Sequence, residues 1–158
     1  MLFERRGLRF GFVLFVAGLL AACGGATGRS LTPNDVASFG TARFDAPSGK
    51  VFAAVKGALQ SEGYQVASAD PTKGMIKTNR KLVRAVAVGN SVSAQAFEVT
   101  RQYLVKIRSD GAATVVVAEP RVFQGDMDLS DGSVWDIDGP MGERTLWRQL
   151  FRDIKEAL

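Results

Sequence analysis

The chain contains no histidine among its 158 residues, and this absence excludes several kinds of chemistry at once. A Ser-His-Asp triad and a Cys-His pair both need an imidazole as the base, so neither can be built. Zinc sites draw mainly on histidine and cysteine, and the chain has one cysteine, Cys23. Carboxylates remain for acid–base work, but they show no recognisable pairing. We therefore expect a protein that is not an enzyme and that holds no cofactor.

The chain also lacks a large excess of charge of one sign. Its formal net charge is +4, and residues 4–9 account for two of these four positive charges. The +2 that remains from Cys23 onward is too small to indicate nucleic acid as a partner. The composition, 46% hydrophobic and 23% charged, is typical of a globular protein, and the length suits one domain. We find no internal repeats.

No apolar run is long enough to cross a bilayer. Residues 1–9 carry three arginines, residues 10–20 carry no charge, and the small residues Ala21 and Ala22 follow. The apolar part ends near Cys23, whereas a membrane-spanning helix needs about 20 predominantly apolar residues. This pattern predicts a secretory signal peptide over residues 1–22.

The exit of this signal peptide, Leu20-Ala21-Ala22-Cys23, resembles a bacterial lipobox. The resemblance implies a diacylglyceryl group on the Cys23 sulfur, cleavage before this residue and acylation of the new amine. Two or more acyl chains anchor a domain stably, because each buried CH₂ contributes about 0.8 kcal/mol. Gly24 stands where lipoproteins retained in the inner membrane often have aspartate. We therefore expect a lipid anchor in the outer membrane with the domain facing the periplasm, and inner-membrane retention stays open. The alternative is a signal peptide that ends at an incidental cysteine.

Residues 23–40 are rich in glycine, serine and threonine, and we interpret them as the lipidated cysteine followed by a flexible linker. The domain is then expected over residues 41–158. A short strand ending at Asp45 precedes a helix that Asp45 or Ser48 could cap and that Gly63 would end. Two short strands follow, over residues 64–68 and 75–79, around the turn "DPTKG".

The clearest strand is predicted over residues 97–108, where apolar and polar side chains alternate and only Arg101 interrupts the apolar row. A turn at "SDG" leads into a strand in which Pro120 indicates an edge or a bulge. An amphipathic helix over residues 142–158 ends the chain. The sequence thus predicts an α+β domain of order β-α-β-β-β-β-α, with two helices on one face of an antiparallel sheet of four to five strands.

Residues 79–96 are the least determined part. They could extend the third strand, form a long loop, or pair as a sheet edge, because "AVAVGNSVSA" alternates small residues. An insertion of this kind between strands is a plausible partner-binding element.

Two charged patterns are candidate contact sites. The acidic stretch Gly125 to Gly139 offers Asp126, Asp128 and Asp131 as metal ligands, although its frame does not fit an EF-hand. The other interpretation of this stretch is a turn-rich connection. Basic residues repeat every four positions along the last predicted helix, at Arg144, Arg148 and Arg152. The acidic stretch, anionic lipid headgroups or an acidic partner could compensate them, or they could form a solvated flank.

Residues 43–78 resemble the opening of the domain in BamC-like (NlpB-like) outer-membrane lipoproteins. The shared elements are a strand, "DAP", a helix with paired apolar residues such as Val51-Phe52, "GY" at its exit and a hairpin ending "KG.I.T". This resemblance implies a helix-grip domain and a non-catalytic protein-interaction module, accessory to envelope or outer-membrane protein assembly. The "DAP" start also occurs in START-like ligand-binding domains. The alternative is therefore a periplasmic binding domain for a small apolar ligand or lipid, with a cavity between sheet and helices.

Overall fold

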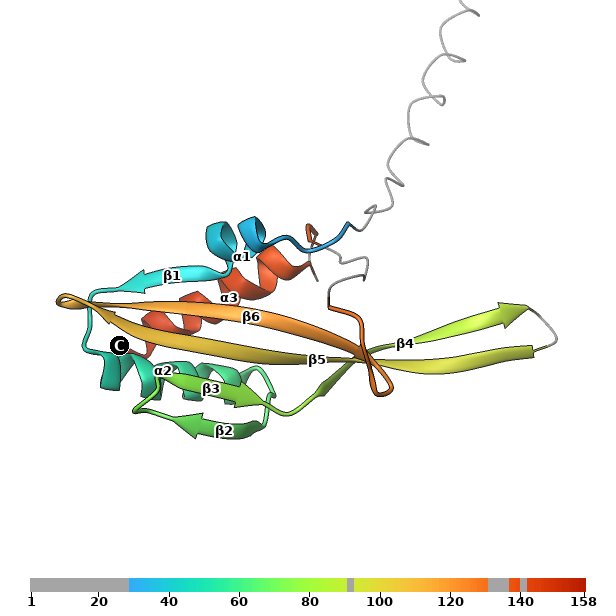
Figure 1. The fold of residues 1–158 in the computed structure, drawn as a ribbon, viewed down its shortest axis with the longest axis horizontal. Coiled ribbons are helices and arrows are strands. Elements are labelled where there is room, and N and C mark those ends of the chain that lie inside the picture. The colour runs from blue at the N-terminus through green and yellow to red at the C-terminus, as the bar shows by residue number, and fades with distance from the viewer. Residues whose placement is uncertain (1–28, 91–92, 131–136, 140–141) are drawn as a thin grey trace, which may run out of the picture.

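A computed structural model describes residues 29–90, 93–130, 137–139 and 142–158. These residues form an α+β fold with an antiparallel sheet, as the sequence predicted (Figure 1). The sheet has the strand order β1-β6-β5-β3-β2, with β4 beside β5 and β7 beside β6. In chain order the elements are α1 (Pro33–Phe39), β1 (Thr41–Phe44), α2 (Ser48–Ser61), β2 (Val66–Asp70), β3 (Met75–Thr78), β4 (Lys81–Asn90), β5 (Ser93–Asp110), β6 (Ala113–Gln124), β7 (Met127–Asp128) and α3 (Glu143–Glu156).

The element count exceeds the prediction. The sheet has seven strands in the described part of the chain instead of four to five, because residues 81–90 pair as a strand with β5 and Met127–Asp128 adds a short edge strand. A third helix, α1, precedes the first strand. None of the three helices within the described ranges has the length and apolar run that crossing a bilayer requires.

Helix α1 corrects the interpretation of residues 24–40 as a flexible linker. The Thr32 hydroxyl accepts a hydrogen bond from the Asp35 main-chain N–H, and the Asp35 carboxylate accepts one from the Thr32 N–H, which is a capping box. Arg29 forms a 2.6 Å ion pair with Asp35. Leu31 and Val36 pack against the main core. The packed domain therefore begins before Thr41.

Helix α2 buries the side predicted from its spacing, with Val51, Val55 and Leu59 fully buried. Its cap differs from the prediction: Pro47 is the N-cap residue and no side chain bonds to the first turn. Gly63 ends the helix as expected, since its φ of 81° lies in the left-handed region that favours glycine.

Strands β5 and β6 form the long central hairpin of the sheet, paired from Asp110↔Ala113 to Val99↔Gln124. Pro120 lies within this register opposite Tyr103 without a break. Strand β1 pairs with β6 only as far as Val117, so among the described residues no strand pairs with Pro120 on that side of β6. This position agrees with the edge that its ring requires.

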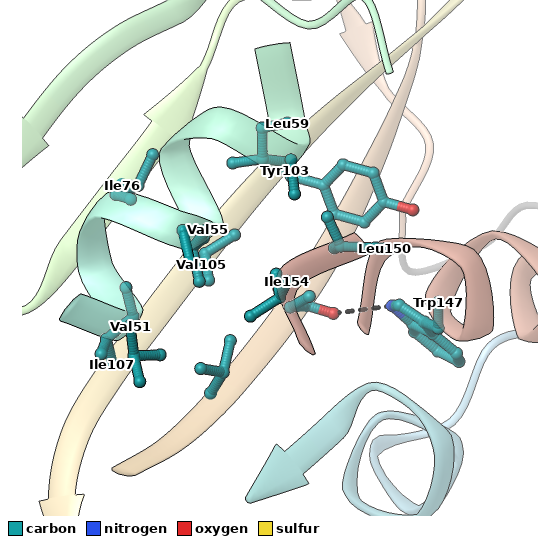
Figure 2. Packing of buried hydrophobic residues seen from close by; sticks show 14 of the residues in the cluster. Val51, Val55, Leu59, Ile76, Tyr103, Val105, Ile107, Trp147, Leu150 and Ile154 are labelled. Carbon is teal, nitrogen blue, oxygen red and sulfur yellow. Dashed lines mark hydrogen bonds between the residues drawn. The ribbon is translucent and has the colours of Figure 1, made fainter. Parts of the chain in front are cut away.

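Helices α2 and α3 cover one face of the sheet and enclose the main core (Figures 1 and 2). The Trp147 indole of α3 is fully buried and donates a 3.0 Å hydrogen bond from Nε1 to the Ala118 carbonyl oxygen of β6. A Cβ on Gly40 would lie 2.8 Å from this indole, so the chain can pass there only without a side chain. Leu150 and Ile154 complete the buried stripe of α3, which fixes this helix on the sheet as predicted.

Candidate functional site

The most prominent surface feature is the outer part of the β4–β5 hairpin, which we call the ribbon and define as residues 84–90 and 93–98. Strands β4 and β5 pair from Lys81↔Arg101 to Asn90↔Ser93. Strand β6 accompanies β5 only as far as Val99. Beyond that point the hairpin extends away from the body as two strands (Figure 1). Residues 85–97 include no charged residue.

The base of the ribbon exposes apolar side chains. Leu82 of β4 is 54% exposed, and Val83, the next residue on the chain, is also exposed. Met127 of β7 is 66% exposed. A register shift between Leu82 and Arg84 marks a β-bulge at this point. Large side chains of this kind, exposed near an open strand edge, are typical of an interaction surface.

A buried polar cluster lies between the sheet and the start of α3. Arg101 occupies the apolar row of β5, and its Nη2 lies 3.2 Å from the Oε2 of Glu143, whose side chain is fully buried. The Tyr103 hydroxyl donates a 2.6 Å hydrogen bond to the other oxygen of Glu143. Burial raises the pKa of the Glu143 carboxyl, and the Arg101 charge and the Tyr103 hydroxyl oppose that rise. Since this carboxyl has no access to solvent, we interpret the cluster as a polar contact between helix and sheet.

The same region joins the end of α2 to the start of the hairpin. The Lys81 ammonium donates to the main-chain oxygen of Glu62 and lies 4.8 Å from the centre of the Tyr64 ring. Burial, with the negative charge of Asp153, raises the pKa of Glu62 to about 7, and Lys81 counteracts it. The Oε1 of Glu62 has no hydrogen-bond partner among the described residues. The first residue of β4 is therefore held by the main chain at the end of α2, and the side chain of the same Glu62 carries a carboxyl whose pKa is near neutral.

The described aspartates of the predicted acidic site pair with different arginines instead of with one another. Asp126 lies 3.4 Å from Arg80, and Asp128 is paired with Arg121. Asp131 lies outside the described residues. Within the described ranges no three carboxylate or thiol side chains lie close enough together to hold a metal ion.

The predicted basic stripe on α3 is largely neutralised within the domain. Arg144 lies 2.8 Å from Asp138 and stacks on the Phe39 ring at 3.9 Å. Arg152 pairs with Asp153 at 3.0 Å. Arg148 is exposed. Compensation by the acidic stretch, one of the hypotheses from sequence, therefore holds for Arg144.

The anchor residues Leu20, Ala21, Ala22 and Cys23 lie outside the described residues, so the lipid anchor stays a prediction. An open groove of about 530 Å³ runs beside the end of α2. Its lining is mostly polar or lacks a side chain, and consists of Lys56, Gln60, Gly63, Tyr64, Gln65 and Val66. It is not the apolar cavity between sheet and helices that the ligand-binding alternative called for, and that alternative also stays a prediction.

Comparisons with known proteins add little. No protein-family model and no curated protein matches the chain. Among solved structures it is similar to a DUF4468 family protein from Bacteroides ovatus ATCC 8483, with a TM-score of 0.41 and 11% sequence identity. The match covers 74% of this chain and 83% of that one. The function is therefore inferred from the residues of this chain alone.

Sequence reasoning missed the buried cluster, although Arg101 gave a signal as the one charge in an apolar row of β5. Its partner could not be identified, because Glu143 is far from it in sequence and looks like an ordinary helix-terminal acid. The ribbon was one of the alternatives left open for residues 79–96.

Proposed function

We propose that the chain is an outer-membrane lipoprotein, anchored by acyl chains on Cys23, whose periplasmic domain is a non-catalytic protein-interaction module accessory to envelope assembly. The lipobox-like stretch before Cys23 supports the anchor. The observation that carries the interaction role is the ribbon, which extends from the body as two strands with open edges in the described part of the chain (Figure 1). Leu82 and Met127, on β4 and β7, are exposed as well. Exposed edges and apolar side chains of this kind take part in protein contacts.

A lipid anchor on Cys23 would hold the domain close to the bilayer, and the packed position of α1 supports this part of the proposal. With α1 part of the domain, only residues 24–28 separate Cys23 from Arg29, the first described residue. A chain of this length spans at most about 20 Å, because an extended residue covers about 3.3–3.6 Å. This length supports a domain that works near the membrane surface, where envelope proteins are within its reach.

Fractionation of cells tests the anchor. Cys23→Ala should move the protein out of the membrane fraction, because it removes the sulfur that carries the lipid. Gly24→Asp is the matched variant, and it should keep the lipid but shift the protein toward the inner membrane. Membrane attachment that survives Cys23→Ala unchanged would refute the anchor.

Site-specific photocrosslinking in intact cells tests the interaction surface. A crosslinking amino acid at Ala85, which is exposed on β4, should give a discrete adduct with a protein. The same amino acid at Lys56, exposed on α2, is the control and should not give that adduct. Equal adducts from both positions would show that the ribbon is no special contact surface.

A further inference from the structure

Strand β4 has an edge that the described part of the chain leaves open. It runs for ten residues and pairs only with β5. Exposed edges in natural proteins are usually protected by charges, prolines, bulges or a covering element. Residues 85–90 contain neither a charge nor a proline, and the bulge lies at the base, before Arg84. This edge is therefore suited to accept another strand.

The ribbon itself also indicates that a strand is missing. A two-stranded hairpin is marginally stable in water, and a third strand or a packing surface is needed for independent stability. Over residues 99–110 of β5, strand β6 supplies this further strand. Over residues 93–98, at the outer end, β4 is the strand that pairs with β5 in the described part of the chain. A strand added along β4 would continue the sheet to the end of the hairpin.

We propose that the added strand is β4 of a second copy of this chain, so that two ribbons form one antiparallel four-stranded sheet of order β5-β4-β4-β5. This inference rests on the proposed function, whose interaction surface it assigns to a partner. Two features favour a second copy. The edge can pair with itself without charge repulsion over residues 85–90, and anchoring two copies in one membrane raises their effective concentration.

The sequence restricts the register of this pairing. A twofold axis at Ala87 places Val86 opposite Val88 and Arg84 opposite Asn90 of the second copy. An axis at Arg84 would place this arginine opposite itself, and like charges directly opposite are destabilising. The symmetric register centred on Ala87 avoids this repulsion and places residues 85–89 of the two copies opposite one another, and the proposal adopts it.

Disulfide trapping in native membranes tests this geometry. Directly opposite residues in antiparallel strands have Cα atoms about 4.5–5.5 Å apart, which a disulfide can bridge. Ala87→Cys in the full chain should therefore give a dimer on oxidation. Ala96→Cys is the matched control, because Ala96 pairs with Ala87 at the same level of the ribbon. Two copies of position 96 would lie three strand spacings apart, about 14 Å, and should not crosslink.

The parent chain serves as a second control, because a lipid-blocked Cys23 cannot form a disulfide. A dimer from the parent chain would mean that Cys23 carries a free thiol, which would contradict the anchor. Such a dimer would form in the parent and in both cysteine variants after oxidation. Failure of the anchor is therefore distinguishable from failure of the ribbon contact, which would affect Ala87→Cys alone.

Charge exchange provides a readout that does not depend on thiols. Ala87→Lys alone and Ala87→Glu alone should each make the detergent-solubilised protein monomeric by light scattering, with an unchanged circular dichroism spectrum. Coexpression of the two variants with different affinity tags should restore copurification. Equal crosslinking by Ala87→Cys and Ala96→Cys, or no recovery with the mixed charges, would overturn the proposal. An adduct from Ala85 to a different envelope protein, with no dimer, would also overturn it and would leave the proposed function standing.

Discussion

Arg101→Met should destabilise the protein strongly at neutral pH and much less at acidic pH. The substitution keeps most of the aliphatic stem and removes the charge that faces Glu143. The Glu143 side chain is fully buried, and within the described residues its carboxylate would keep one hydrogen bond, from Tyr103. Removing one partner of a buried ion pair typically costs about 3–5 kcal/mol, because an uncompensated charge is left behind.

Proton uptake limits this loss and makes it depend on pH. Burial already raises the pKa of Glu143 above its usual 4.5, and without Arg101 the pKa rises further. The folded variant can then escape the buried charge by protonating Glu143, which costs about 1.4 kcal/mol per pH unit above 4.5. The stability that the variant loses through the buried charge therefore cannot exceed about 4 kcal/mol at pH 7.5 and about 1.4 kcal/mol at pH 5.5. The stability gap between parent and variant should therefore narrow by up to about 2.7 kcal/mol over these two units, and by less to the extent that the raised pKa of Glu143 already makes the parent depend on pH.

Urea unfolding followed by tryptophan fluorescence at pH 7.5 and 5.5 measures this gap. Arg101 also lowers the pKa of Glu62, so the pair of measurements should be repeated with Glu62→Gln in both chains. Glu143→Gln is the control background, because a neutral amide can still accept from Tyr103. There the effect of Arg101→Met should lose its pH dependence. A gap of equal size at both pH values in the first background would refute the assignment of Glu143 as the responsible group.

Four further substitutions test other parts of the fold by urea unfolding. The folded state raises the pKa of Glu62 to about 7, so stability is highest below the usual 4.5 and falls as pH rises through 7. Glu62→Gln should therefore be about 1–2 kcal/mol more stable than the parent at pH 8, allowing for partial exposure, and equal to it near pH 4. A difference that stays constant with pH would contradict this. Gly74→Ala should destabilise by at least about 1–3 kcal/mol, because φ is 61° and the new Cβ would clash with the Ile107 carbonyl. Gly49→Ala in α2, which meets nothing within 4 Å, should instead stabilise by about 0.5–1 kcal/mol. Trp147→Phe should cost about 2–4 kcal/mol, since it loses the buried indole hydrogen bond and leaves a cavity. An unchanged midpoint would show that this indole does not fix α3 to the sheet.

The elements that sequence predicted best are those with strong periodicity. The stripes of α2 and α3 and the alternation in β5 each bury a continuous row, represented by Val55, Leu150 and Val105. Such rows have a single physical solution, two helices against one sheet face, and the α+β class follows from it. Turn chemistry was equally informative, because Gly63 and Gly111 adopt the positive φ expected at a helix end and a hairpin.

The parts that could not be predicted from the sequence depend on contacts with residues that are distant along the chain, and a local sequence pattern does not reveal such contacts. Helix α1 is only seven residues long, and isolated helices of this length do not form in water. It is stabilised by its capping box, by the ion pair from Arg29 and by packing of Val36 on the core. The ribbon has the opposite character: its small uncharged residues suit a strand, a loop or an edge equally well, and only pairing with β5 selects one of them. A segment whose conformation depends so fully on a neighbouring strand is also the segment most able to gain stability from a further strand. The ambiguity of residues 79–96 in the sequence and the open edge of β4 in the fold therefore have the same physical origin, and a partner strand would remove both.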